Sequence, residues 1–215
     1  MKYLSSMVLF FMFSCGKKEA VLLPKSNVTL VADVVDHSSI YLFFKTKGKD
    51  TLVEVNRKNS IISTNWILNI DKRLPLRLVI PEIMKLQQKK REEKAHKNEN
   101  AENYYAYADS IGKNMAFIPF TDVYYNMVKP NSFESFLRFK KDGMIQFYQS
   151  NTDLFSKGKL ENFINHLFIE HESEIIFSFD SNMTFGEYLQ NKILIEKLKI
   201  TKKGIWVNRE KEFIY

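Results

Sequence analysis

The chain contains a single cysteine, Cys15, so it can form no disulfide bond within itself. Small secreted domains are commonly held together by disulfides, whereas this chain of 215 residues must rely on the packing of a core. Hydrophobic residues make up 45% of the sequence and include 18 Phe, which is ample apolar area to bury. With only 7 Gly and 5 Pro to impose sharp turns, we expect regular helices and strands to dominate.

The residues before Cys15 have the pattern of an export signal. Lys2 is followed by a continuous apolar run, Met7–Phe13, which is too short to cross a bilayer. Ser14-Cys15-Gly16 follows directly and resembles the lipobox of bacterial lipoproteins. This resemblance implies cleavage just before Cys15 and a diacylglycerol thioether on its sulfur. The alternative is an ordinary secretory signal that happens to contain a cysteine.

Lipid on Cys15 predicts a location in the cell envelope. Two or three acyl chains anchor a protein stably, whereas one is marginal. Gly16 stands where the usual inner-membrane retention signal has Asp, and Gly16-Lys17-Lys18 is unlike the acidic tags of surface-exported lipoproteins. We therefore expect a lipid-anchored protein on the periplasmic face of the outer membrane, with the inner membrane as the open alternative.

The charge balance narrows the class of partner. Lys and Arg total 32 against 25 Asp and Glu, a net charge of +7. A basic balance suits nucleic acid, an anionic membrane or an acidic protein, and it also arises from a solvated Lys-rich surface. An exported protein rarely meets nucleic acid, so we expect no nucleic-acid partner.

The lipobox resemblance implies a signal peptide at 1–14 and a lipidated tether at 15–27, and hydrophobic periodicity predicts two α+β domains at 28–130 and 131–215. The N-terminal domain is expected to contain strands near 28–32, 39–44, 51–55 and 66–70, a helix from Pro75, and a polar, partly mobile helical segment at 87–103. The C-terminal domain is expected to follow the order β-β-α-β-α-β. The predicted class is α+β, with mixed sheets and helices packed on one face.

The C-terminal pattern resembles the periplasmic domain of the ExbD/TolR family, small partners in proton-driven energy transduction at the envelope. The resemblance is carried by the hairpin Lys141-Asp142-Gly143-Met144-Ile145, the strand Ile175–Phe179 ending in Asp180, and the stretch from Phe185 to Tyr188. The resemblance covers residues 132–215, and residues 39–120 show a weaker one. Family members cross the membrane with a helix that carries a proton-binding Asp, and the apolar run here is short and has no acid. The resemblance therefore implies a binding role without proton coupling.

The sequence lacks the motifs of common enzyme chemistry. It has no Gly-x-Ser-x-Gly nucleophile elbow, no phosphate-binding glycine loop and no His-Glu-x-x-His helix. His166 and His171 are five positions apart, about 140° around a helix, which is poor spacing for one metal ion. We therefore predict no catalytic residue, no metal and no cofactor.

Three residues are candidates for binding. Asp180 lies where a strand ends and a helix is about to begin; its alternative role is to cap the turn before Thr184. Tyr104 and Tyr105 belong to a group of five tyrosines that would form a stacking surface for sugars or a protein, or would pack in the core. The other three are Tyr107, Tyr124 and Tyr125.

Two functions remain open at this stage. The first is a non-catalytic lipoprotein that binds another envelope protein or serves as a scaffold. The second is an envelope enzyme that acts on peptidoglycan or glycan through carboxylates that no motif identifies.

Overall fold

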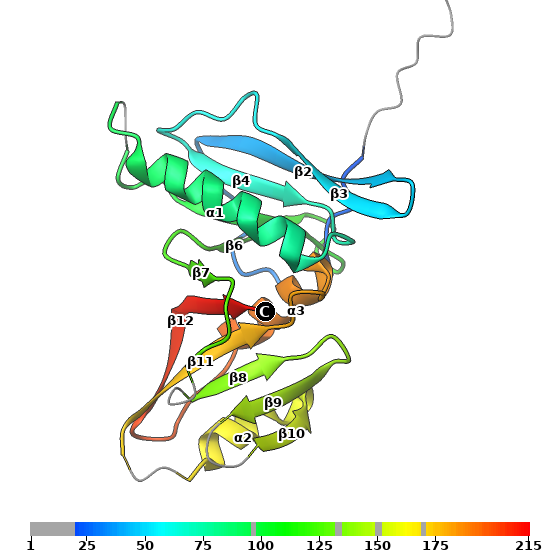
Figure 1. The fold of residues 1–215 in the computed structure, drawn as a ribbon. Helices are drawn as coiled ribbons and strands as arrows, with labels where there is room; N and C mark the ends of the chain where they lie inside the picture. Colours follow the sequence, from blue (N-terminus) through cyan, green and yellow to red (C-terminus); the bar gives the residue numbers. More distant parts are fainter. Residues whose placement is uncertain (1–19, 96–97, 132–134, 149–151, 169–170) are drawn as a thin grey trace, which may run out of the picture.

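A computed structural model describes residues 20–95, 98–131, 135–148, 152–168 and 171–215 of the chain. Cys15 and the apolar run before it lie outside these ranges, so their predicted roles stay predictions. The described residues form two six-stranded sheets and three α-helices (Figure 1). The predicted α+β class with mixed sheets is confirmed.

The first sheet has the strand order β1-β5-β4-β2-β3, and β6 also pairs with β5. Its strands are β1 (Lys25–Ser26), β2 (His37–Lys47), β3 (Asp50–Asn56), β4 (Asn65–Ile70), β5 (Asn103–Asp109) and β6 (Met115–Pro119). Strands β2, β4 and β5 run parallel, and β3 pairs antiparallel with β2. Helix α1 (Leu76–Glu92) connects β4 to β5. The predicted strand at 28–32 is not formed; only an isolated bridge joins Val31 to Phe117.

The second sheet has the strand order β10-β9-β8-β11-β12-β7. Its strands are β7 (Tyr124–Asn126), β8 (Phe136–Phe139), β9 (Met144–Tyr148), β10 (Thr152–Ser156), β11 (Ser173–Phe179) and β12 (Ile205–Ile214). Helix α2 (Leu160–His166) precedes β11, and α3 (Phe185–Glu196) connects β11 to β12. The observed order is β-β-β-α-β-α-β, which differs from the expected β-β-α-β-α-β by the strand β10 between the hairpin and α2.

The two sheets repeat one topology. In the first, β2, β3, β4, α1 and β5 follow one another along the chain, and β8, β9, β11, α3 and β12 do so in the second, with β10 and α2 inserted. Both place the strands in the same spatial order, β5-β4-β2-β3 and β12-β11-β8-β9, with a parallel core and an antiparallel hairpin. The chain thus contains two copies of one α+β unit.

The turns before α1 and α3 join the two units reciprocally. Pro75 and Thr184 form an isolated antiparallel bridge, and equivalent backbone groups exchange hydrogen bonds across it. The donors and acceptors are Leu76 N to Met183 O (2.9 Å), Phe185 N to Leu74 O (2.7 Å), Arg77 N to Ser181 O (2.8 Å) and Gly186 N to Lys72 O (3.0 Å). One constant shift in residue number converts each bond into its counterpart: Leu76 corresponds to Phe185 and Arg77 to Gly186. The junction therefore has approximate twofold symmetry.

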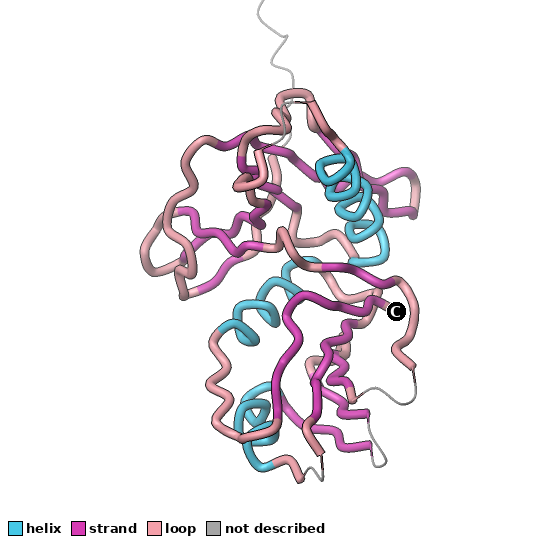
Figure 2. The backbone as a smooth tube through the Cα atoms, turned by 90° about the vertical axis from the view of Figure 1, so that its left-hand side faces the viewer, coloured by secondary structure: helices cyan, strands magenta, loops and turns pink. Residues whose placement is uncertain are grey.

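A continuous core spans both units. Buried residues of the first sheet and α1, such as Leu68 and Ile80, belong to the same apolar cluster as Phe179 and Tyr188 of the second unit. Figure 2 shows α3 lying where the two sheets meet. The outer face of the first sheet is covered by the N-terminal arm, because Leu23 and other arm residues pack on it. We use the name N-terminal arm for residues 22–36.

Sheet membership departs from the predicted domain bounds at two places. The predicted tether at 15–27 includes β1, which pairs with β5 of the first sheet. Strand β7, assigned by sequence to the N-terminal domain, pairs with β12 of the second sheet. Pro130-Asn131 has turn-forming composition, which suggested a boundary there, but long-range strand pairing places the change of sheet between β6 and β7.

The segment 87–103 also differs from its expected form. Its first residues are the last turns of α1, and its last residue begins β5. Gln87 and Lys90 are buried although the segment is almost wholly polar. The polar composition pointed to an exposed extension because it does not reveal that these side chains find buried hydrogen-bond partners.

Candidate functional site

Asp180 shapes a turn at the end of β11. Its Oδ1 accepts a hydrogen bond from the backbone N–H of Asn182 (2.9 Å), and its Oδ2 lies 4.0 Å from a guanidinium nitrogen of Arg138. Asp71 occupies the same position in the first unit and accepts a bond from Arg73 N in the same way (3.0 Å). The repeat of this contact supports the alternative role that the sequence left open for Asp180, the capping of a turn.

The two tyrosines expected to bind a ligand point to opposite faces of the first sheet, because adjacent strand residues alternate. Tyr104 lies half-buried on the outer face, where it donates a hydrogen bond to Glu102; burial and this carboxylate raise its pKa to about 12. Tyr105 is fully buried and stacks on Phe120 with ring centroids 3.8 Å apart. Tyr105 therefore cannot contact a ligand at the surface, which corrects its predicted role.

A buried polar chain connects the two units. The Tyr105 and Tyr125 hydroxyls are 2.6 Å apart, and Tyr125 lies 3.4 Å from Tyr188. Tyr188 donates to Glu212 Oε2 (2.7 Å), and Lys192 Nζ donates to Glu212 Oε1 (2.5 Å). All five side chains are buried.

This chain of contacts is structural because it is closed to solvent. Burial, followed by the charge of Glu212, raises the pKa of both Tyr125 and Tyr188, so these hydroxyls stay protonated and can donate. Sequence reasoning missed Glu212 and Lys192. Glu212 lies in the charged run Arg209–Glu212, which is typical of a solvated surface, and Lys192 is a single lysine in a helix, where lysine is normally exposed.

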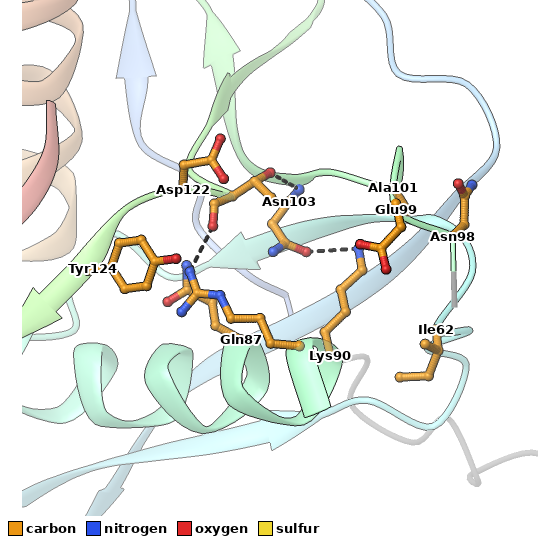
Figure 3. Close-up of a pocket in the computed structure, with 11 residues that line it drawn as sticks. Ile62, Gln87, Lys90, Asn98, Glu99, Ala101, Asn103, Asp122 and Tyr124 are labelled. Atoms are coloured by element: carbon orange, nitrogen blue, oxygen red, sulfur yellow. Dashed lines mark hydrogen bonds between the residues drawn. The ribbon is translucent and has the colours of Figure 1, made fainter. Parts of the chain in front are cut away.

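A polar pocket of about 250 Å³ opens between the C-terminal half of α1 and the loops around β5 (Figure 3). Lys90 forms one wall, and its ammonium donates to Thr64 O (3.0 Å), Glu102 O (3.1 Å) and Asn103 Oδ1 (3.0 Å). Burial lowers the pKa of Lys90 to about 8, although the charge of Glu102 opposes the shift. This lysine ties α1 to the start of β5.

The remaining lining groups of the pocket give it mixed charge. Gln87 donates to the carbonyls of Phe120 and Val123, both at 3.1 Å. Arg91 lies over the ring of Tyr124, 4.3 Å from its centroid. The carboxylates of Glu99 and Asp122 also line the pocket, so it can offer both acids and bases to a small polar ligand.

The outer edge of β3 is a second candidate, suited to a protein partner. Among the described residues, no strand pairs with β3 on the side away from β2. The two-residue turn Gly48-Lys49 makes Lys47 and Asp50 a hydrogen-bonded pair, and such pairs alternate along an antiparallel ladder. The backbone groups of Thr51, Val53 and Val55 therefore point outward.

The same edge is closed in the second unit. There, β10 pairs antiparallel with β9, on the edge that corresponds to the open edge of β3. After β3 the chain turns away instead, with Ser60 N bonded to Arg57 O (3.1 Å) and Ile61 N to Ser38 Oγ (3.1 Å). Within the described ranges, the strand position beside β3 is thus vacant, whereas β10 fills the matching position in the second unit.

In the ranges that the structure covers, no three His, Cys, Asp or Glu side chains gather closely enough to hold a metal ion. No helix within those ranges has the length and apolar character needed to cross a bilayer. No protein-family model, no curated protein and no solved structure matches this chain.

Proposed function

We propose that the protein is a lipid-anchored component of the bacterial cell envelope that binds another envelope protein and catalyses no reaction itself. The observation that carries the proposal is the open edge of β3, because an exposed edge pairs readily with an extended segment of another chain. Main-chain hydrogen bonds to Thr51, Val53 and Val55 supply affinity, and exposed side chains such as Leu52 supply selectivity.

The sequence supports the other parts of this proposal. The lipobox-like residues around Cys15 favour an anchor in the outer membrane facing the periplasm. The ExbD/TolR resemblance of 132–215 favours a binding role. The weaker resemblance of 39–120 agrees with the topology that the two units share. Energy coupling is not proposed, since the apolar segment carries no ionisable group that could move a proton.

The anchor is tested by Cys15→Ser. We expect the variant to leave the membrane fraction, because without acyl chains the apolar run is cleaved off or is too short to hold the protein. Flotation of membranes on a density gradient measures this. Continued flotation of the Cys15→Ser protein with membranes would contradict the anchor.

The binding edge is tested by Val53→Pro. Proline removes the outward-pointing N–H and is tolerated on edge strands, so we expect the fold to survive and the partner to be lost. A photo-crosslinking residue at Leu52, in the acylated protein in its own membranes, measures partner contact. Val53→Thr keeps the N–H and serves as the matched control.

The crosslinking result has three informative outcomes. A crosslink to another envelope protein that Val53→Pro abolishes and Val53→Thr retains supports the proposal. A partner captured equally by all three proteins places binding elsewhere on the molecule. A crosslink to a second copy of this chain, or to no protein at all, contradicts the proposed function.

The alternative function is an envelope enzyme acting on peptidoglycan or glycan, and the polar pocket favours it because Glu99 and Asp122 both line its wall. Two carboxylates at one pocket can act as acid and base in glycoside hydrolysis. Asp122→Asn and Glu99→Gln would then abolish release of soluble fragments from purified sacculi, with Asp153→Asn on β10 as the control. Absence of any fragment release by the unaltered protein removes this alternative.

A further inference from the structure

The N-terminal arm is fixed to the fold almost from the start of the described chain. Leu22 N donates to Asp71 Oδ2 (3.2 Å), and Leu22 O accepts from Lys72 N (2.8 Å). Pro24 O and Ser26 O then accept from Ala108 N (2.9 Å) and Ser110 N (2.8 Å) of the β5 region. Residues from Leu22 onward therefore belong to the folded body and cannot act as a tether.

With the proposed anchor in place, this attachment limits how far the folded body can lie from the membrane. If Cys15 carries lipid, only Gly16–Val21 connects the membrane to the body. Six extended residues reach at most about 20 Å, at roughly 3.3–3.6 Å each. That reach is shorter than a single folded unit, so one end of the molecule must stay at the bilayer surface.

The end at which the arm enters is basic and partly apolar. Figure 1 shows the chain entering at the end of the first sheet where the β2–β3 hairpin lies. Contacts link the two: Asp71 binds both Leu22 and Arg73, and the Arg73 guanidinium lies 4.3 Å from the ring centroid of Phe44 in β2. The side chain of Leu22 is itself 45% exposed.

Cations outnumber carboxylates in this region. The cations are Lys25, Lys45, Lys47, Lys49, Lys72 and Arg73. The carboxylates are Asp50, Glu54, Asp71 and Asp109, the last beside Lys25; Glu54 is paired with Lys45 and Asp71 with Arg73. Exposed lysines beside an exposed leucine suit a surface of anionic phospholipid headgroups.

We infer that this end of the molecule, formed by Leu22, the turn Asp71–Arg73 and the β2–β3 hairpin, lies against an anionic phospholipid surface. The inference rests on the proposed lipid anchor and adds an orientation to it. The open edge of β3 then works close to the membrane, and β10 with α2 lies at the far end of the molecule (Figure 1).

The orientation is tested with one spin label at a time on the acylated protein. Cys15 is consumed by lipid, so an introduced cysteine is the only free thiol. Leu22→Cys and Leu154→Cys are matched sites, since these leucines are 45% and 54% exposed. In vesicles of phosphatidylethanolamine and phosphatidylglycerol, we expect the label at position 22 to be shielded from a water-soluble paramagnetic reagent and the label at 154 to stay accessible.

Charge reversal tests the headgroup contact. Replacing Lys47, Lys49 and Lys72 by Glu should restore reagent access at position 22 by about tenfold, because the attraction becomes repulsion. The same reversal at Lys141, Lys159 and Lys203, which are exposed lysines of the second unit, should leave access unchanged. Phosphatidylcholine vesicles should give little shielding with either set.

The possible results separate the anchor from the orientation. Vesicles that fail to carry the protein on flotation contradict the anchor. Vesicles that carry it with labels at 22 and 154 equally accessible overturn the orientation and leave the anchor standing. Equal shielding in anionic and phosphatidylcholine vesicles would also overturn the proposed anionic contact.

Discussion

Asp71 and Asp180 show how one position serves two units differently. Both accept a hydrogen bond from the backbone N–H two residues later. Asp71 is fully buried and also binds Arg73 through two further bonds, of 2.8 and 2.7 Å, and the N-terminal arm through Leu22. Burial opposes ionisation of Asp71, but the bonds from Arg73 and Leu22 outweigh it and hold its pKa below the usual range.

Asp71→Asn should weaken the fold and release the arm. A carboxylate pKa below its unfolded value stabilises the protein above about pH 4, and this contribution is lost as pH falls through the folded-state pKa. We expect a loss of about 1–3 kcal/mol at neutral pH, because several bonds to a charged group weaken. Urea unfolding of both proteins at several pH values measures this, and a difference that persists undiminished in acid would contradict it.

Lys192 and Glu212 form a buried ion pair, and its contribution to the stability of the fold depends on the presence of both partners. Glu212→Gln leaves the ammonium of Lys192 buried without a carboxylate, and should cost about 3–5 kcal/mol. Replacing the pair by Lys192→Met and Glu212→Leu together should cost much less, since no unpaired charge remains, although Tyr188 loses its acceptor. Urea midpoints of the single and double variants test this; equal losses would show that the pair does not act as a unit.

At the scale of elements, the sequence correctly predicted features that depend on residues close together in the chain. The Asp142-Gly143 hairpin is present in the structure as expected, and the local sequence Thr184–Glu187 forms a capping box at the start of α3. Strand β10 was not predicted, because its pairing with β9 is decided by contacts that a pattern does not contain. For the same reason, the burial of Tyr105 and Lys90 and the open edge of β3 became visible only in the structure.

Gly186→Ala should damage the junction between the units. A Cβ at this position would lie 3.1 Å from Lys72 Cβ and 3.2 Å from Lys72 O, the carbonyl that accepts the reciprocal hydrogen bond from Gly186 N. We expect a destabilisation of about 1–3 kcal/mol by overpacking. Gly158→Ala is the control, since a Cβ there meets nothing within 4 Å. Thermal unfolding of both variants measures the difference, and equal midpoints would contradict the role of the junction.

At the scale of the molecule, the continuous core makes the two units one folding unit. Trp66 lies in β4 of the first sheet and Trp206 in β12 of the second, and the chain has no other tryptophan. Trp66→Phe and Trp206→Phe therefore leave one fluorescent reporter in each sheet. We expect both reporters to give a single transition in urea with the same slope, because neither sheet keeps its buried surface alone. Two separated transitions within one variant would show that the units unfold independently.

The reciprocal turns that join α1 and α3 also determine how many partners one molecule can hold. An association of two identical chains around the same axis would present every surface twice, including two equal open edges. Here the halves are covalently fused and differ: among the described residues, the position beside the hairpin is vacant in the first half and is filled by β10 in the second. The described part of the chain therefore offers the position beside β3 once, so a partner that pairs there is recruited one to one.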